Sequence, residues 1–224
     1  MVRVKLLTLA AAVLVCAGVA APAFAGSVTV PVFVSGLDGP WSYVNGGLNT
    51  NYQYGVGDEL APAVISGASG LTFAAGSDIT ITYVSGTETA GPGWPVVDAA
   101  GDTGYEFDSG PGSSGTYGPA SYMDPSTYPI YLSELVGTFA DSSGDIVGTP
   151  FAIGDGPFKI VVPTGATQLE LGINDDIYSD NTGGFNVDVA GTGVSPIPEP
   201  GSFLLLGTGI LSMAGMLRRK FAGR

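Results

Sequence analysis

The 224-residue chain has no histidine and a single cysteine. Without histidine it cannot build a Ser-His-Asp or Cys-His nucleophile system, a histidine general base, or a His-rich zinc or haem site. Without a second cysteine, a disulfide framework, a thiolate metal site and an iron–sulfur cluster are excluded as well. The remaining chemistry uses oxygen. Carboxylates can act as acid–base pairs, or can surround a hard cation such as calcium together with carbonyl groups.

Basic residues are also scarce, and almost all of them stand at the two ends of the chain. Residues 26–195 contain 19 carboxylates and one base, Lys159, so this body has a net charge of −18. A body this acidic repels phosphate backbones, and no nucleic-acid partner is expected. Both ends carry net positive charge, so they are interpreted separately from the body.

Residues 1–25 are typical of a secretory signal helix. Arg3 and Lys5 precede an apolar stretch over 6–19, and the stretch ends in small residues. Ala23-Phe24-Ala25 fits the A-x-A cleavage pattern, so signal peptidase is expected to cut between Ala25 and Gly26. The alternative is an uncleaved membrane anchor.

Residues 196–224 combine a proline-rich start, an apolar run and a basic end. The run 203–217 is predicted to be a transmembrane helix, but at about 1.5 Å per residue it is shorter than a bilayer core of about 30 Å. The basic end should stay in the cytoplasm and leave the body outside. A short membrane anchor would explain these features. The tail also resembles the PEP-CTERM sorting signal of Gram-negative bacteria, on the residues Pro198, Glu199, Pro200, Arg218, Arg219 and Lys220.

The PEP-CTERM resemblance implies processing by an exosortase, a membrane enzyme that cuts near the motif. The protein would then be exported, held in the inner membrane during sorting, and finally placed at the cell surface or in the extracellular matrix. Such substrates accompany exopolysaccharide export and biofilm formation. The tail family also carries the label "ice-binding protein C-terminal domain", which implies nothing about ice here.

The body has no helical periodicity, and several of its segments alternate with a period of two, as half-buried strands do. Gly, Pro, Asn and Asp separate these segments. We therefore predict an all-β fold, a single antiparallel β-sandwich of jelly-roll type over 26–195. The predicted strands are 27–34, 41–44, 71–73, 79–83, 130–139, 158–162, 169–173 and 185–189.

Residues 99–129 lack this alternation and are predicted to form a long Gly/Pro/Tyr loop. A loop of this length is either functional or disordered. Its tyrosines, among them Tyr105 and Tyr117, are candidate platforms for stacking on sugar rings, as are Trp41 and Trp94. The alternatives are packing within the loop for the tyrosines and core packing for the tryptophans.

The densest group of side-chain oxygens lies at 174–184, between the last two predicted strands. Three aspartates so close together repel each other, and a divalent cation reverses the sign of that interaction. Calcium takes six to eight oxygen ligands at flexible geometry. The sequence thus favours a calcium site in this connection, although Asp, Asn and Gly are also ordinary turn residues.

Much of the body resembles the family of calcium-dependent galactose-binding bacterial lectins and related accessory carbohydrate-binding domains. The similar segments are 73–81, 129–139, 156–158, 169–175 and 180–187, and the most specific of them is the ND-x4-DN-x-G-x-F run that begins at Asn174. In the lectins, sugar hydroxyls bind the calcium directly. The lectins' histidine that contacts sugar has no counterpart here, so the resemblance implies a metal-stabilised fold more than galactose specificity.

Carried over residue by residue, the resemblance implies five calcium ligands. Asp175 stands at the position of the family's calcium aspartate, and Asp180 with Asn181 stands at the position of its paired terminal ligands. A backbone carbonyl from Ile177 or a neighbour and another near Ala90 would complete the set. Calcium is therefore the expected cofactor.

Three functions follow from these features. The first is an exported, non-catalytic surface or matrix protein that binds extracellular polysaccharide through a calcium-held sandwich. The second is a structural matrix component with no ligand beyond calcium. The third is a glycoside hydrolase that uses two carboxylates. Its candidate acids are Glu88, Glu106, Glu134 and Glu170, of which Glu170 and Glu134 are expected to face solvent on their strands.

Overall fold

The computed structural model describes residues 25–42, 57–107, 123–127 and 129–194. Residues 25–195 group into one compact unit. The signal segment before Ala25 and the sorting tail, with its predicted helix at 203–217, lie outside the described residues. Within the described ranges, no helix is long and apolar enough to cross a membrane.

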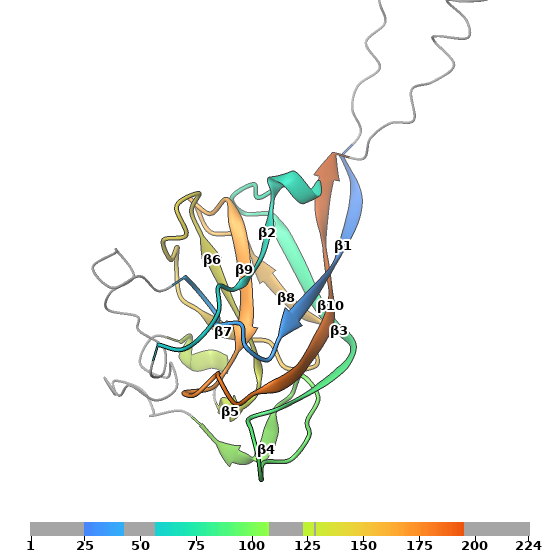
Figure 1. Cartoon of the computed structure of the whole chain (residues 1–224). Helices are drawn as coiled ribbons and strands as arrows, with labels where there is room; N and C mark the ends of the chain where they lie inside the picture. The colour runs from blue at the N-terminus through green and yellow to red at the C-terminus, as the bar shows by residue number, and fades with distance from the viewer. Residues whose placement is uncertain (1–24, 43–56, 108–122, 128, 195–224) are drawn as a thin grey trace, which may run out of the picture. The chain divides into compact units, whose positions relative to one another are not determined.

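Two four-stranded antiparallel sheets form the body (Figure 1). The first sheet has the order β1 (Ala25–Ser35), β10 (Thr182–Val194), β3 (Asp78–Thr89) and β8 (Phe158–Val161). The second has the order β2 (Ala63–Ser66), β9 (Gln168–Ile173), β6 (Leu135–Ala140) and β7 (Phe151–Ala152). A separate ribbon pairs β4 (Asp102–Glu106) with β5 (Tyr131–Leu132), and two 3-10 turns, η3 (Gly67–Ser69) and η4 (Pro125–Thr127), complete the elements. The all-β antiparallel sandwich predicted from the sequence is confirmed.

The chain crosses repeatedly between the two sheets. From β1 to β3 and from β7 to β10, each successive strand of the sandwich lies in the opposite sheet, and only β6 and β7 are consecutive partners. Such an order, with neighbours drawn from distant parts of the sequence, is of the jelly-roll type. It brings the end of β3 beside the start of β10, where Glu88 pairs with Gly183.

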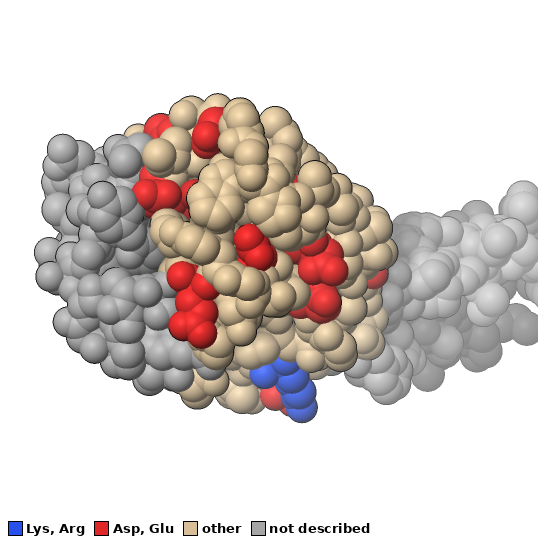
Figure 2. Space-filling view, turned by 90° about the horizontal axis from the view of Figure 1, so that it is seen from below, with Lys and Arg blue, Asp and Glu red and all other residues tan. Residues whose placement is uncertain are grey.

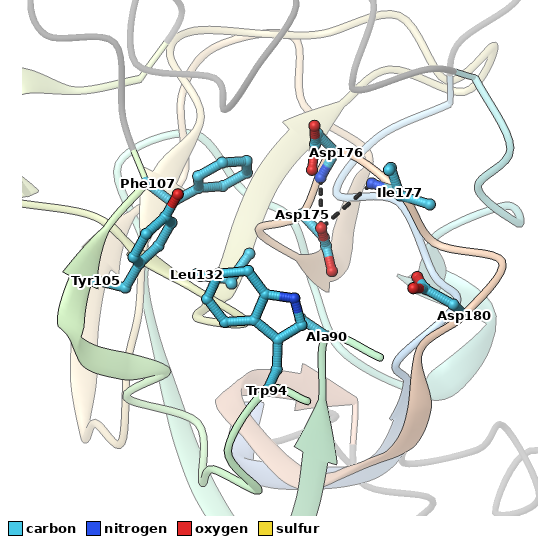
Figure 3. Close-up of a pocket in the computed structure, with 9 residues that line it drawn as sticks. All are labelled: Ala90, Trp94, Tyr105, Phe107, Leu132, Asp175, Asp176, Ile177 and Asp180. Atoms are coloured by element: carbon cyan, nitrogen blue, oxygen red, sulfur yellow. Dashed lines mark hydrogen bonds between the residues drawn. The ribbon is translucent and has the colours of Figure 1, made fainter. Parts of the chain in front are cut away.

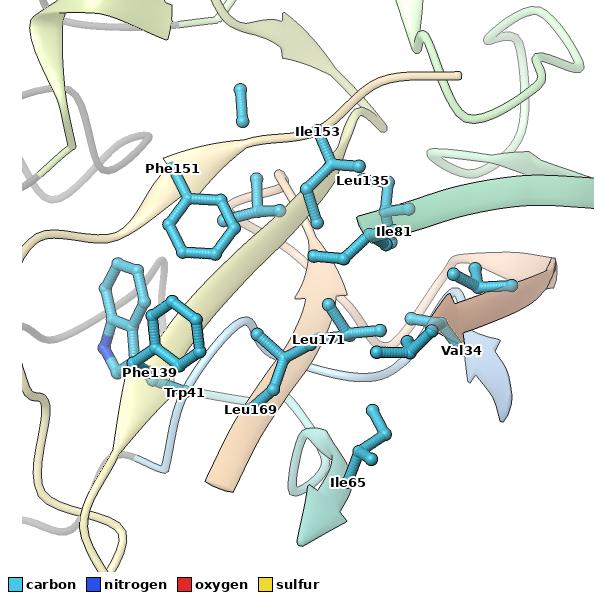
Figure 4. Close-up of a cluster of buried hydrophobic side chains, with 14 of the residues drawn as sticks. Val34, Trp41, Ile65, Ile81, Leu135, Phe139, Phe151, Ile153, Leu169 and Leu171 are labelled. Atoms are coloured by element: carbon cyan, nitrogen blue, oxygen red, sulfur yellow. The ribbon is translucent and has the colours of Figure 1, made fainter. Parts of the chain in front are cut away.

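The core lies between the sheets and follows from the alternation seen in the sequence (Figure 4). In β3, Ile79 and Ile81 have no exposed surface, while Thr80 between them is half-buried. Leu169 and Leu171 of β9 meet them from the second sheet within the same buried cluster. Burying a side chain of this size contributes about 1.5–3 kcal/mol, so the alternating residues fix which face of each strand turns inward.

Several predicted strands differ in detail from the observed ones. The predicted strand 130–139 is broken at Ser133, whose φ of 65° is left-handed, and becomes β5 and β6. The predicted strand at 71–73 is reduced to one bridge, Leu71 with Gly193, and residues 41–42 are not in a strand. The predicted long loop contains β4. The short strands β2 and β7 were not predicted.

The segment 38–42 covers the outer face of β9 and explains two wrong predictions. Trp41 is only 1% exposed and packs in the core, so it offers no surface to a sugar (Figure 4). Glu170 is fully buried rather than solvent-facing, because this segment lies over it. The Ser42 N–H and the Gln168 amide donate hydrogen bonds to its carboxylate. A Cβ on Gly172 would collide with the Gly39 carbonyl, so the two chains approach closely there.

Glu134 also turns inward, against the prediction. It is 7% exposed, and its carboxylate accepts a hydrogen bond of 2.9 Å from the Tyr131 N–H. The left-handed backbone at Ser133 breaks the strand between β5 and β6. The alternation of inward and outward side chains therefore does not continue from β5 into β6.

The two ends of the sandwich carry different features. Ala25 pairs with Val194, so the beginning of β1 and the end of β10 leave the body together. The β4–β5 ribbon lies at the opposite end, beside the start of β10 (Figure 1). The connection from β9 to β10, which holds the predicted calcium ligands, is at this second end.

Candidate functional site

The β9–β10 connection, residues 174–181, is held by hydrogen bonds at both of its ends. Asn174 is fully buried, and its side-chain amide donates to the carbonyls of Phe107 at 3.2 Å and Tyr131 at 2.8 Å. The buried Tyr178 hydroxyl donates to the Ile173 carbonyl at 2.7 Å. These contacts tie the loop to the β4–β5 ribbon and to the end of β9, so its aspartates stand on a fixed frame.

Asp58 supports the middle of the same loop. Its two carboxylate oxygens accept hydrogen bonds of 3.0 Å from the N–H groups of Tyr178 and Ser179. Burial raises the pKa of Asp58, but the hydrogen bonds from Tyr178 and Ser179 outweigh it and leave the pKa below its ordinary value. Asp58 therefore acts as an ionised acceptor that fixes the loop backbone.

Replacing Asp58 by alanine is expected to loosen this loop. Two backbone N–H groups lose their acceptor, which costs about 1–3 kcal/mol when such groups stay away from water. If the loop holds a metal, its affinity should fall by about tenfold, as it does when supporting residues of metal sites are removed. Thermal unfolding with and without calcium measures both effects. The control is Asp98→Ala, since Asp98 is exposed and accepts a hydrogen bond from the Ala100 N–H within its own turn. Equal behaviour of the two variants would contradict this role for Asp58.

A pocket of about 370 Å³ opens beside the loop (Figure 3). One side is acidic and comes from the β9–β10 connection, and the other side is aromatic and comes from the chain after β3 and from β4. The lining residues are Ala90, Trp94, Tyr105, Phe107, Leu132, Asp175, Asp176, Ile177 and Asp180.

The aromatic side of the pocket is a row of three rings. Trp94 and Tyr105 pack edge to face, with ring centroids 5.0 Å apart, and Tyr105 lies 6.0 Å from Phe107. Trp94 and Tyr105 keep 41% and 43% of their surface exposed. Both rings therefore expose part of their surface in the pocket and pack against each other.

On the acidic side, some oxygens are occupied and others are not. Asp175 is 3% exposed, and its Oδ1 accepts hydrogen bonds from the N–H groups of Asp176 at 2.6 Å and Ile177 at 3.2 Å. Its Oδ2 is buried and has no hydrogen-bond partner among the described residues. Asn181 is 5% exposed and donates from its amide nitrogen to the Gly36 carbonyl at 2.9 Å, which leaves its buried Oδ1 without a partner.

Asp180 stands across from the end of β3. A Cβ on Gly91, whose φ is 103°, would collide with the Asp180 carboxylate, so this carboxylate lies directly against the backbone that follows Ala90. Asp180 itself is exposed and lines the pocket. The Asp180 carboxylate of the loop and the backbone at Ala90 after β3 therefore lie together at the pocket.

Glu88 is the residue that sequence reasoning misplaced. It was a candidate catalytic acid, but it is 1% exposed and does not line the pocket. Neither of its carboxylate oxygens has a hydrogen-bond partner in the described structure. The signal in the sequence was its position two residues before Ala90, because the family resemblance already implied a calcium-binding carbonyl near Ala90.

Burial dominates the electrostatics of these carboxylates. Burial, with a smaller contribution from the charges of Asp175 and Asp180, raises the pKa of Glu88 to about 8, while the nearby Ser133 hydroxyl lowers it in part without a well-aligned hydrogen bond. Burial likewise raises the pKa of Asp175 to about 6, against the lowering effect of the loop N–H groups and the Asn181 amide. Burial also raises the pKa of Asp176. Such shifts mark carboxylates that lack a positive partner.

The structure brings most of the predicted site residues together and separates others. Asp175, Asp180, Ile177 and Ala90 line one pocket with Trp94 and Tyr105, and Asn181 is buried at the same loop. Trp41 lies in the core, and Tyr117 is outside the described residues. No three His, Cys, Asp or Glu side chains in the described part of the chain are placed to hold a metal by themselves. A metal here would also need amide and carbonyl oxygens.

The face of the body shown in Figure 2 is acidic. Carboxylates are scattered over the face seen there, and the basic side chain in view is accompanied by an acidic neighbour. Lys159 is the sole base of the body, and its Nζ lies 2.8 Å from Asp78 Oδ2. Because both side chains are more than half exposed, this ion pair adds little stability.

Comparisons with known proteins identify the tail. Residues 196–220 match the family model described as the PEP-CTERM protein-sorting motif. Among curated proteins, none matches the chain. Among solved structures, AJLec from the sea anemone Anthopleura japonica is similar, with 14% identity over 76% of this chain and 98% of that one, and a TM-score of 0.34. A similarity this distant carries no argument.

The sorting motif defines the class of this protein. It is an exosortase-targeted, exported protein that is anchored in the membrane during sorting, and exosortase is its processing partner. This conclusion rests on the tail alone.

Proposed function

We propose that the body is a non-catalytic, calcium-dependent carbohydrate-binding domain that attaches to exopolysaccharide at the surface or in the matrix of a Gram-negative bacterium. The observation that carries the proposal is the two-sided pocket, with Asp175 and Asp180 facing Trp94 and Tyr105 (Figure 3). Sugars have hydroxyl groups that suit the acidic side and C–H faces that suit the aromatic side.

The residues present fit a calcium ion. Asp175 and Asp180 offer carboxylates, Asn181 offers an amide oxygen, and the chain at Ala90 and Ile177 offers backbone carbonyls. The buried and unpartnered Oδ2 of Asp175 and Oδ1 of Asn181 are acceptors that only a cation or a donor would satisfy. When bound, calcium would supply positive charge to these oxygens and open positions for sugar hydroxyls.

Each part of the pocket then has a task. Asp58 and Asn174 hold the loop in place, so the carboxylates are oriented before the ligand arrives. Trp94 and Tyr105 stack on the sugar ring and exclude water from one side. The negative surface repels acidic polymers, so the proposal favours neutral sugars.

A purely structural matrix protein is the second candidate. The buried, unpartnered oxygens beside the pocket favour it, because a cation there would stabilise the fold whether or not a sugar binds. The hydrolase candidate has little support. Glu88, Glu134 and Glu170 are all buried, and Glu106 does not line the pocket, so these four acids offer no pair across it.

Binding of the body, residues 26–195, to a glycan array with calcium and with EGTA tests the proposal. Binding of neutral glycans that EGTA abolishes would support it. Calcium-dependent stabilisation without binding of any glycan would favour the structural candidate instead.

Trp94→Ala separates the two sides of the pocket. We expect glycan affinity to fall by about tenfold or more, since a stacked aromatic anchor is worth at least about 1.4 kcal/mol. Calcium affinity should be unchanged, because the indole holds no metal-binding oxygen. Titrating calcium and then a glycan into the variant and the wild type measures both. Unaltered glycan affinity would remove the aromatic side from the proposed site.

A further inference from the structure

Glu88 is a further carboxylate beside the β9–β10 loop, and it comes from strand β3. In the first sheet, Glu88 of β3 pairs with Gly183 of β10. On the other side of Gly183 lies Gly36, whose N–H donates to the Gly183 carbonyl. With glycine at both neighbouring positions, no side chain separates Glu88 from the Asn181 side chain. A Cβ placed on Gly36 would lie 3.0 Å from Glu88 Cγ and 3.4 Å from Asn181 Cβ.

The buried polar atoms that lack partners are concentrated here. In the described ranges there are six such atoms, and four of them are Glu88 Oε1, Glu88 Oε2, Asp175 Oδ2 and Asn181 Oδ1. All four are acceptors, and their residues are 1%, 3% and 5% exposed. A buried acceptor without a partner costs about 1–3 kcal/mol, and a charged one costs more, so this grouping favours a bound cation, or a proton on Glu88 when no cation is bound.

Among the described residues, no basic side chain supplies a positive partner. Lys159, the sole base of the body, pairs with Asp78 at the other end of β3. The Asn181 amide nitrogen donates to the Gly36 carbonyl, and its amide oxygen is a further buried acceptor without a partner among the described residues. The charges of Asp175 and Asp180 are close enough to raise the pKa of Glu88.

We propose that Glu88 is an additional, direct calcium ligand, which binds the ion from the buried side through its carboxylate together with Asp175 and Asn181. This inference rests on the proposed calcium site and adds a ligand that the lectin resemblance does not imply. Glu88 and Asp175, together with the Asn181 amide oxygen, would hold the ion with protein atoms from two segments of the chain, and the added ligand charge raises calcium affinity. The ion would then remain in place when no sugar is present.

Calcium titrations of the wild type, Glu88→Gln and Glu88→Asp test the inference, with Glu106→Gln as the matched control at an exposed position. Glutamine keeps the volume and removes the charge, and aspartate keeps the charge but shortens the reach. We expect both Glu88 variants to lose at least about tenfold in calcium affinity, since even supporting residues of metal sites cost that much. Glu106→Gln should not change it.

Two further readouts distinguish a ligand from a structural residue. Europium luminescence lifetimes should report an additional metal-bound water in Glu88→Gln, and thermal unfolding without metal should show that this variant is folded and at least as stable as the wild type. Wild-type affinity in Glu88→Gln would overturn the inference and leave the calcium proposal intact. If Glu88→Asp alone kept the calcium affinity of the wild type, Glu88 would act only as a distant charge and not as a ligand, which would also overturn the inference. A wild type that binds no calcium would overturn both.

Discussion

The calcium-free body is expected to lose stability as the pH rises from about 5 to about 8. Burial raises the pKa of Glu88 from 4.5 to about 8 and that of Asp175 from 3.8 to about 6. Between these values the folded protein holds protons that the unfolded chain has released. Stability is therefore greatest below the ordinary pKa of the carboxyl and is lost as the pH rises toward the folded pKa. For Glu88 the loss is of the order of 5 kcal/mol.

Calcium should reverse this dependence. A metal binds only the ionised carboxylates, so its affinity and the stability that it adds increase with pH. Urea unfolding at several pH values, in calcium-stripped buffer and in excess calcium, measures the two slopes. In stripped buffer, Glu88→Gln should flatten the slope, because the glutamine has no proton to lose. A stripped wild type whose stability is constant or increases over this range would contradict the account of Glu88 and Asp175.

The second large effect is expected from Asp180→Ala combined with Asn181→Ala. The double variant removes one carboxylate against the β3 end and one buried amide oxygen, and leaves only the Asp175 and Glu88 carboxylates for the metal. Calcium affinity should fall by at least about 100-fold, since two ligands are lost where a supporting residue alone costs 10- to 100-fold. Glycan binding should disappear with the metal, because the proposed hydroxyl contacts depend on it.

The matched control for this double variant is Asn186→Ala combined with Asp188→Ala. The control removes the same two residue types, and both of its residues lie in β10. They line a hollow formed by β1, β3 and β10 of the first sheet. Thermal shift with calcium and glycan binding should be as in the wild type. If the loop variant keeps its response to calcium, the metal is held elsewhere. If the control variant loses glycan binding, the hollow over β1, β3 and β10 is the glycan-binding surface.

The fold was largely predictable because its core strands alternate plainly. Ile79 and Ile81 in β3 and Leu169 and Leu171 in β9 have the two-residue period that buries one face of a strand, and the structure buries them. The Asp175-to-Asn181 connection was predictable for the same reason, since it lies between two such strands. Ala90 reached the prediction only through the family resemblance.

The failures have a common physical cause, which is contact between segments far apart in the sequence. Glu170 was assigned to solvent by alternation, but residues 38–42 cover that face of the strand and supply its hydrogen bond from Ser42. Trp41 is buried by the same packing. Glu88 became a site residue through its register with Gly183, which no local pattern contains.

Calorimetric titration of the calcium-stripped body with calcium at pH 7.5 tests the central claim most directly. The account predicts a single saturable site, and a rise in Tm of about 5–10 °C at 100 times the dissociation constant, where the added stability is about 2.7 kcal/mol. Calcium sites of extracellular domains bind at about 1 mM or tighter. No heat of binding and no change in Tm up to about 10 mM calcium, well above that range, would contradict it.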